Sequence, residues 1–458
     1  MKILLIRPAP DRETIGLQHV MICEPLELEY LYAAVADKGH TIEIVDMILE
    51  KRPLRTFLEA VQPDLVAVTA YIVHVAVVID TCQQAKRICP GCRTVVGGVH
   101  AEVVPGDFKS DAIDFVIGSG GVKAYQALVN ALEHSQDTSG ICGVWNQTES
   151  RCPLSYETDM PIPHRDSVSR YRSRYYYMFH NPCALIKTAY GCPFSCRFCF
   201  CREITGHCYY ERPIDQVVQE LKGIPERDIY IVDDNFLYRP ERIRQFCRAV
   251  QEAGLDKRFL VYGRADFIVA HPDVMEQFKA CGGRSVIVGL ESCQGSELEQ
   301  FNKKSSVEVN EEAVSLLARL DIDCYGTLIL GMDWDKENFR QLRRWLRRLG
   351  LVFVNLQPLT PLPGTELFDE YKSDMIIPRS DYAKWDLAHL VLQPTRMTQA
   401  AYYWQIITLY YAITLRPSSI ITCLVKYKWR ENLKMALGAG RVGRQYIARL
   451  MRAWRMGQ

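Results

Sequence analysis

The chain has 458 residues, enough for two or three domains. Its composition, with 48% hydrophobic and 24% charged residues, excludes a disordered or fibrous protein. Lysine and arginine number 55 against 54 aspartates and glutamates, so the net charge of +1 excludes a global attraction to nucleic acid. The seventeen cysteines follow an N-terminus without a signal-peptide pattern, which predicts reduced thiols in the cytoplasm.

The first domain is predicted over residues 1–135, where short aliphatic runs alternate with helical patterns. The runs that predict parallel strands buried on both faces are 2–7, 41–46, 64–70, 93–98 and 112–118. Apolar residues at helical spacing lie between them at 26–39, 74–88 and 122–134. This α/β alternation predicts a doubly wound, Rossmann-like sheet, which binds ligands beyond the carboxyl ends of its strands.

Residues 136–182 are less regular and are interpreted as a linker. A second alternating series, predicted over residues 183–370, contains strand patterns at 184–190, 228–234, 258–266, 285–292, 324–333 and 351–358. Six strands, most of them followed by a helix, predict a partial (β/α)6 barrel of the TIM type. Residues 371–458 have no strand pattern and are predicted to form a helical C-terminal subdomain with a basic tail.

Two stretches of this C-terminal subdomain raise the question of membrane contact. Residues 397–415 carry no charge, but their glutamines and the following Arg416 and Pro417 favour a buried helix over a membrane span. From Lys426 to Gln458, nine lysines and arginines accompany one glutamate. This tail is interpreted either as a solvated helix face or as an attachment to an anionic membrane surface.

Three cysteines with the spacing C-x-x-x-C-x-x-C follow the first strand of the second series: Cys192, Cys196 and Cys199. Three thiolates on a tight loop can bind three irons of a four-iron cubane and leave the fourth iron open for another ligand. A structural zinc site is the alternative, with Cys201 or Cys208 as its fourth ligand. No second C-x-x-C or H-x-x-x-H lies nearby to complete such a site.

The segment GCPFSCRFC resembles the cluster-binding loop of the radical S-adenosylmethionine enzymes. The resemblance extends over about 184–370 through DDNF at 233–236, Arg264, GLES at 289–292 and the last two strands. It implies that the three cysteines bind a [4Fe-4S] cluster and that S-adenosylmethionine binds the open iron. The residues implied to contact S-adenosylmethionine are Phe198, Asp233, Arg264, Glu291 and Ser292. A helix cap by Asp233 and a structural ion pair between Arg264 and Glu291 are the alternatives, and DDNF replaces the glycine-glycine-glutamate of the family.

A doubly wound domain ahead of such a barrel resembles the cobalamin-dependent branch of these enzymes, with VVGGVHAEVVP and IRPAP as local matches. In that branch the nucleotide tail of cobalamin lies beside the sheet, where only small residues leave room. The residues implied to bind cobalamin are Thr69, Gly97, Gly98, His100, Gly118 and Gly120. The alternative is that the glycines only form strand-to-helix turns. The D-x-H-x-x-G motif is absent and the acidic turn after the fifth strand is GSGG, so we expect no histidine on cobalt.

The resemblance implies a methyltransferase that passes a methyl group from methylcobalamin to an unactivated carbon after a 5'-deoxyadenosyl radical removes a hydrogen atom. Oxidative cyclisation or rearrangement with the same cofactors is the alternative within the family. A corrinoid- or metal-binding sensor is the alternative outside enzymes, and it would not turn over S-adenosylmethionine. The sequence identifies no catalytic residue for the substrate.

The partners expected are a small-molecule or natural-product substrate and an external one-electron reductant of the flavodoxin or ferredoxin type. No nucleic acid is expected. The predicted location is cytoplasmic, with membrane contact through the basic tail as an addition.

Overall fold

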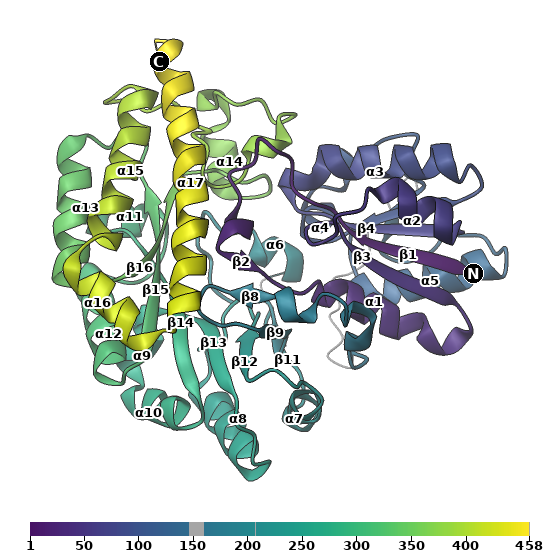
Figure 1. The fold of residues 1–458 in the computed structure, drawn as a ribbon, viewed down its shortest axis with the longest axis horizontal. Coiled ribbons are helices and arrows are strands. Elements are labelled where there is room, and N and C mark those ends of the chain that lie inside the picture. Colours follow the sequence, from purple (N-terminus) through teal and green to yellow (C-terminus); the bar gives the residue numbers. More distant parts are fainter. Residues whose placement is uncertain (146–159, 207, 458) are drawn as a thin grey trace.

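The computed structural model describes residues 1–145, 160–206 and 208–457. Two six-stranded sheets lie side by side, and the C-terminal helices cover the second of them (Figure 1). Residues 146–159 of the predicted linker, and Gln458 at the end of the basic tail, lie outside the described residues.

The first sheet has the strand order β3-β1-β4-β5-β6-β7, and all neighbours are parallel except the pair of β6 and β7. Its strands are β1 (Lys2–Arg7), β3 (Thr41–Asp46), β4 (Leu65–Thr69), β5 (Arg93–Gly97), β6 (Phe115–Ile117) and β7 (Val144–Trp145). The five predicted strands are confirmed, and the segment predicted as a linker supplies β7 at the edge of the sheet.

Helices cover both faces of this sheet. On one face, α2 (Leu54–Val61) and α3 (Val75–Ile88) share a buried core with Leu4 and Val66. On the other, α1 (Leu26–Val35) and α5 (Gly121–Glu133) pack on residues that alternate with these along the same strands. The doubly wound fold is therefore confirmed, while α2 was not predicted. The short helix α4 (Val99–Val103) follows β5.

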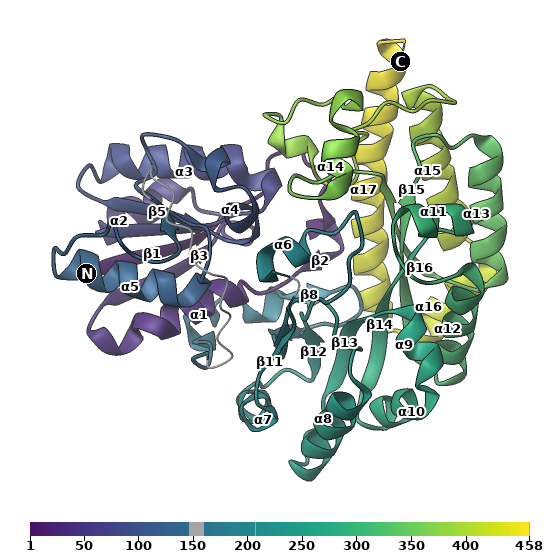
Figure 2. The same ribbon diagram turned by 180° about the vertical axis from the view of Figure 1, so that it is seen from behind.

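The second sheet contains six parallel strands in the order β16-β15-β14-β13-β12-β9. They are β9 (Cys183–Ile186), β12 (Asp228–Ile231), β13 (Arg258–Gly263), β14 (Gly283–Glu291), β15 (Asp323–Leu330) and β16 (Phe353–Pro358). The helices of this part are α6 (Cys201–Thr205), α7 (Ile214–Lys222), α8 (Pro240–Glu252), α9 (Ala265–Ala270), α10 (Pro272–Ala280), α11 (Gly295–Gln300), α12 (Val307–Arg319), α13 (Lys336–Arg348) and α14 (Glu366–Glu370). The predicted partial barrel is confirmed (Figure 2).

Local sequence explains where several of these helices begin. The side chain of Asp335 accepts hydrogen bonds from the backbone N–H groups of Glu337 and Asn338, which caps α13. The same helix buries Phe339 and Leu342 at helical spacing. Two short antiparallel pairs complete the strands: β2 (Met21–Ile22) with β8 (Tyr176–Tyr177), and β10 (Ala189–Tyr190) with β11 (Tyr210–Glu211).

The C-terminal helices are α15 (Gln399–Thr414), α16 (Pro417–Lys426) and α17 (Trp429–Arg455). Helix α15 buries seven residues, among them Tyr402 and Ile406, which confirms the prediction of a buried helix there. No single described helix is long and apolar enough to cross a membrane. Among the described residues, only α15 and α16 taken together have the required length and composition, and the chain bends by 57° between them. Fifteen cysteines are free thiols, whereas Cys142 is disulfide-bonded, contrary to the expectation of reduced thiols throughout.

Candidate functional site

The three cysteines of the C-x-x-x-C-x-x-C motif lie on the loop between β10 and α6, beyond the carboxyl end of β9. Cys196 is buried, and Cys192 and Cys199 are half-buried. Among the described residues, no three His, Cys, Asp or Glu side chains lie close enough to share a single metal ion. A cubane binds each thiolate through a different iron, and three thiolates on one loop suit a cluster whose fourth iron stays open.

Side chains from other elements hold this loop in place. The carboxylate of Asp234 accepts a hydrogen bond from the backbone N–H of Gly191 at 2.9 Å. The side-chain amide of Asn302 donates to the carbonyl of Ser195 at 2.8 Å. Gly191 has a φ of +85°, and a Cβ there would lie 2.2 Å from the carbonyl oxygen of Cys208. Only glycine fits this turn, which explains the glycine ahead of the first cysteine.

Positive charge lies beneath the buried cysteine. Arg264 places Nη1 3.9 Å from the sulfur of Cys196 and its guanidinium 3.8 Å from the ring centre of Phe194. Arg264 also donates to the carbonyl of Lys303 at 2.6 Å. Burial raises the pKa of the Cys196 thiol, and the charges of Lys303 and Arg264 oppose that rise. The site thus provides cations that would stabilise a thiolate at this position.

Glu291 lies at a bulge of β14, where the pairing with β15 changes register and its φ is +57°. Its carboxylate forms a buried ion pair with the ammonium of Lys303 at 2.7 Å. Lys303 Nζ also lies 5.9 Å from the ring centre of Phe198. Phe198, Arg264 and Glu291 are thus gathered around the cysteine loop. The ion pair of Glu291 is with Lys303 rather than with Arg264, which pairs with Asp266.

Two other predicted residues are engaged within the protein. Asp233 is buried and accepts hydrogen bonds from the backbone N–H and the hydroxyl of Thr188. Ser292 is fully buried, where its hydroxyl bonds to Glu297 and accepts from the backbone N–H of Gln294 at 3.0 Å. Both side chains stabilise turns beyond the strand ends. Their contact with S-adenosylmethionine stays a prediction.

The residues predicted to bind cobalamin lie along the carboxyl edge of the first sheet. Thr69 ends β4, Gly97 ends β5, and Gly118 and Gly120 follow β6. A Cβ at Gly97, Gly118 or Gly120 would meet nothing closer than 3.7 Å, so this edge is open. At Gly98, with φ +99°, a Cβ would lie 2.8 Å from the backbone nitrogen of Ala70. The edge therefore offers the room that a buried cofactor tail requires.

His100 on α4 is buried beside this edge. Its Nε2 lies 2.8 Å from a carboxylate oxygen of Asp107, which also accepts from Arg379 of the C-terminal region at 2.7 Å. This nitrogen is engaged with Asp107 in the structure, and the expectation that no histidine binds cobalt stays a prediction. His100 also lines a cavity of about 60 Å³ between the two sheets, together with Tyr71, Ile72, Val99, Val103, Phe200, Leu362 and Pro363. The cavity joins the glycine-rich edge to Phe200, the residue after Cys199.

Two tyrosines, one from each domain, are partly exposed and yet desolvated by neighbouring atoms. Tyr71 is 52% exposed, yet desolvation by the surrounding protein raises the pKa of its hydroxyl to about 12. Tyr262 on β13 is 38% exposed, and desolvation raises its pKa as well. Lys187, whose ammonium lies 3.3 Å from Asp234, is close enough to influence the charge of Tyr71.

Comparisons with known proteins match the two sheets to two different families. Residues 14–129 match the family described as B12 binding domain, and residues 186–346 match the Radical SAM superfamily. The chain is a cobalamin-dependent radical S-adenosylmethionine enzyme. Its cofactors are accordingly a [4Fe-4S] cluster, S-adenosylmethionine and cobalamin.

Individual relatives extend over most of this enzyme. It is 29% identical to the hopanoid C-3 methylase of Methylococcus capsulatus over 415 residues, which cover 89% of this chain and 79% of the relative. It is 25% identical to the anaerobic magnesium-protoporphyrin IX monomethyl ester cyclase of Cereibacter sphaeroides, over 87% of this chain and 68% of the cyclase. The fold is similar to that of the radical S-adenosylmethionine methyltransferase TsrM from Kitasatospora setae, with TM-score 0.70 and 17% identity over 98% of this chain and 99% of that chain.

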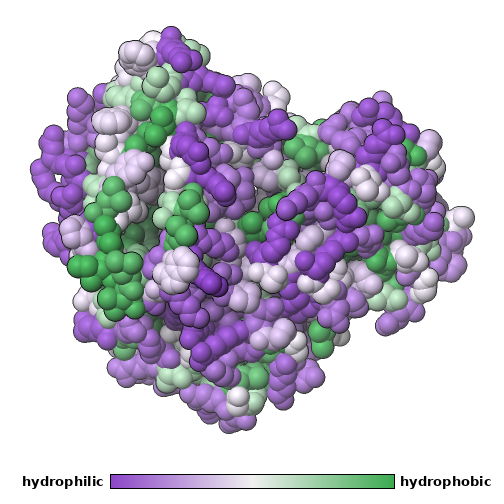
Figure 3. Space-filling view, in the orientation of Figure 1, coloured by the Kyte–Doolittle hydropathy of each residue, from purple (hydrophilic) through white to green (hydrophobic). Residues whose placement is uncertain are grey.

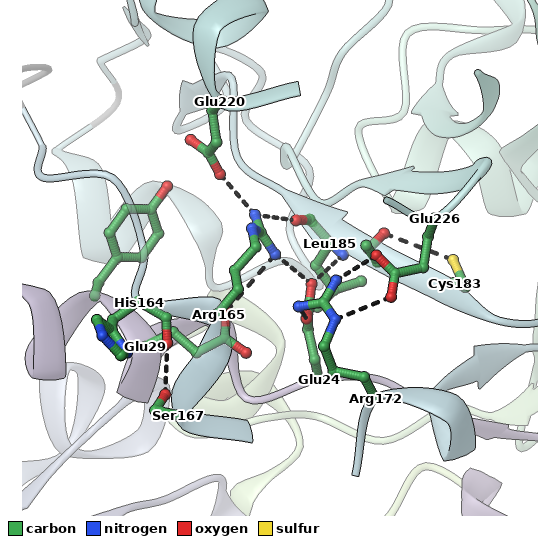
Figure 4. A network of polar contacts seen from close by, with 12 residues as sticks. Glu24, Glu29, His164, Arg165, Ser167, Arg172, Cys183, Leu185, Glu220 and Glu226 are labelled. Atoms are coloured by element: carbon green, nitrogen blue, oxygen red, sulfur yellow. Dashed lines mark hydrogen bonds and ion pairs between the residues drawn. The ribbon is translucent and has the colours of Figure 1, made fainter. Parts of the chain in front are cut away.

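A buried charged network joins the two domains of this radical enzyme (Figure 4). The guanidinium of Arg165 donates to Glu24, which precedes α1, and to Glu220 on α7, both at 2.6 Å. It also donates to the carbonyl of Leu185 on β9 at 2.8 Å. Because one side chain binds a segment of each domain, the network fixes the position of the cobalamin-binding sheet relative to the barrel.

Four residues of the site were not predicted: Asp234, Lys303, Lys187 and Tyr71. Asp234 belongs to the DDNF segment, which resembles the corresponding segment of the radical S-adenosylmethionine enzymes, so the sequence did point to this region. Lys303 follows Glu291 by twelve residues and reaches it only because α11 turns the chain back over the strand end. Lys187 and Tyr71 belong to different domains, and nothing in their local sequence marks them.

Proposed function

We propose that this enzyme is a C-methyltransferase that transfers a methyl group from methylcobalamin to an unactivated carbon. One observation carries the proposal: the cavity between the domains is lined both by His100, beside the glycine-rich edge, and by Phe200, beside the cysteine loop. A substrate held between these two elements would lie within reach of both cofactors. The names of the hopanoid C-3 methylase and of the methyltransferase TsrM support the same reaction class.

We further propose that Cys192, Cys196 and Cys199 are the protein ligands of the cluster. When bound, the cofactors supply a 5'-deoxyadenosyl radical that removes hydrogen from the substrate and a methyl group that replaces it. The protein positions the loop through Asp234 and Arg264. Phe198, Asp233, Arg264, Glu291 and Ser292 remain our candidates for S-adenosylmethionine contacts. Of these five residues, Phe198, Arg264 and Glu291 lie nearest the cysteine loop.

For cobalamin we propose contacts along the open edge, by Thr69, Gly97, Gly98, His100, Gly118 and Gly120. For the substrate we propose contacts with Tyr71, Lys187 and Tyr262. Aromatic walls favour binding of flat or apolar groups, and the ammonium of Lys187 provides one polar contact.

The cluster assignment can be tested by anaerobic reconstitution with iron and sulfide. The triple variant Cys192→Ala, Cys196→Ala, Cys199→Ala should lose the cluster and the formation of 5'-deoxyadenosine. The matched control is Cys201→Ala, which removes a neighbouring thiol and should retain about four irons per chain. A full cluster in the triple variant, or its loss in the control, would refute the assignment.

Oxidative cyclisation remains the second candidate because of the similarity to the magnesium-protoporphyrin IX monomethyl ester cyclase. The two reactions differ in the fate of the methyl group of S-adenosylmethionine, which only a methyltransferase transfers. A product that carries no label from methyl-labelled S-adenosylmethionine would favour cyclisation.

The substrate is a small molecule, and we propose a natural product of moderate size. We also propose a flavodoxin- or ferredoxin-type protein as the one-electron reductant, and a cytoplasmic location with peripheral membrane contact through the C-terminal region. The proposed reductant can be tested by following reduction of the cluster by a flavodoxin or ferredoxin with electron paramagnetic resonance.

A further inference from the structure

The exposed large apolar side chains of this protein gather on its last three helices. On α16, Ile420, Ile421, Leu424 and Val425 are all exposed, Val425 by 79%. Residues at these spacings share one face of a helix. Figure 3 shows hydrophobic side chains over α16 and along α17 on the same side of the molecule. A patch of this kind on a water-soluble surface marks an interaction site.

Helix α17 continues this apolar face along its length. At 3.6 residues per turn, its exposed apolar residues fall within a strip about 100° wide. They are Trp429, Leu433, Leu437, Ile447, Met451 and Trp454. The residues that α17 buries against the body, among them Met435 and Tyr446, lie on the opposite part of its circumference. The strip therefore faces away from the protein.

Arginines line one flank of this strip. By the same helical spacing they are Arg430, Arg441, Arg444, Arg452 and Arg455. Four of them, Arg430, Arg441, Arg444 and Arg455, form no ion pair with any residue that the structure describes. Beyond Glu431 the chain contains no acidic residue. An apolar strip bordered by unpaired cations is the pattern of a helix that lies in a membrane interface.

Other occupants fit this surface less well. A membrane span is disfavoured because α15, the longer helix of the bent pair, is packed into the body of the protein. A symmetric dimer would bring the arginine rows of two copies together, where like charges repel. Tryptophan and arginine together suit an anionic lipid surface, with rings at the headgroup level and guanidinium groups on phosphates.

We infer that α16 and α17 form the membrane-docking face of this enzyme, and that the face recognises anionic phospholipid. Ile421, Leu424 and Trp429 insert at the boundary of headgroups and acyl chains, while Arg441 and Arg444 bind lipid phosphates. The inference deepens the proposed membrane contact and does not depend on the proposed reaction.

The test is sedimentation of the full-length holoenzyme with vesicles of phosphatidylcholine, with and without phosphatidylglycerol. We expect binding only to the anionic vesicles, with a steep loss of binding as salt increases. The double variant Arg441→Glu, Arg444→Glu should reduce binding by at least about thirtyfold, because each basic residue lost contributes about 1 kcal/mol and the new carboxylates are repelled by the anionic surface. The double variant Ile421→Glu, Leu424→Glu should abolish it.

The matched control is Lys51→Glu with Arg87→Glu, which reverses two exposed charges on the N-terminal domain and should leave vesicle binding unchanged. Formation of 5'-deoxyadenosine without vesicles should be the same in all variants, which separates this inference from the proposed reaction. Equal binding to neutral and anionic vesicles, no binding, or a dimer that the Ile421→Glu, Leu424→Glu variant dissociates would each overturn it.

Discussion

Replacing Gly98 by alanine tests how the carboxyl edge of the first sheet is built. Gly98 has φ +99° and ψ 176°, a conformation that costs other residues about 1–3 kcal/mol. The new Cβ would also lie 2.8 Å from the nitrogen and 2.9 Å from the oxygen of Ala70. Overpacking of this kind costs about 1–3 kcal/mol. We therefore expect Gly98→Ala to lower the free energy of unfolding by about 2–6 kcal/mol, even without cobalamin.

The assay is urea unfolding of the cobalamin-free protein, followed by circular dichroism. Gly97→Ala is the matched control, because its Cβ would make only an ordinary contact with Ile117 at 3.7 Å. This control should unfold like the wild type, within about 1 kcal/mol. If the edge holds the cofactor tail, both variants should weaken cobalamin binding, measured by the visible spectrum. An unchanged unfolding midpoint in Gly98→Ala would refute the reasoning about the backbone.

Three further predictions concern buried charges and the cluster. Arg165→Met should destabilise the protein by about 3–5 kcal/mol in urea unfolding, since it leaves buried carboxylates unpaired. A variant as stable as the wild type would contradict this. Lys303→Met should cost a similar amount because Glu291 loses its buried partner. A loss below about 1 kcal/mol would contradict a stabilising role of this ion pair. Asp234→Asn should retain the fold but slow cluster assembly, measured by absorbance, because the acceptor for Gly191 is weakened.

Apart from β7, the strands of both sheets could be predicted from the sequence because each is an apolar run between glycines and polar residues. The predicted range 41–46 is the range of β3 itself. Helix α2 was missed because its eight residues are too few for a periodic signal. The cysteine loop was predicted because its ligands are neighbours in the chain.

Contacts between distant segments could not be predicted in the same way. Arg165 meets Glu24 and Glu220, which lie 141 and 55 residues away in the chain. Lys303 binds Glu291 only through a register change in β14. Such pairs depend on how elements pack, and a single sequence does not encode this in any local pattern. The same holds for the apolar strip of α17, because only the fold shows which side of the helix the body leaves uncovered.

The central claim is that cobalamin carries a methyl group in this enzyme, and it can be tested without the substrate. Cobalamin-loaded protein is incubated anaerobically with S-adenosylmethionine that bears a deuterated methyl group, under reducing conditions, and the bound corrinoid is analysed by mass spectrometry. The account predicts deuterated methylcobalamin together with an equal amount of S-adenosylhomocysteine. Formation of 5'-deoxyadenosine with no labelled methylcobalamin would contradict it and would favour cyclisation or rearrangement.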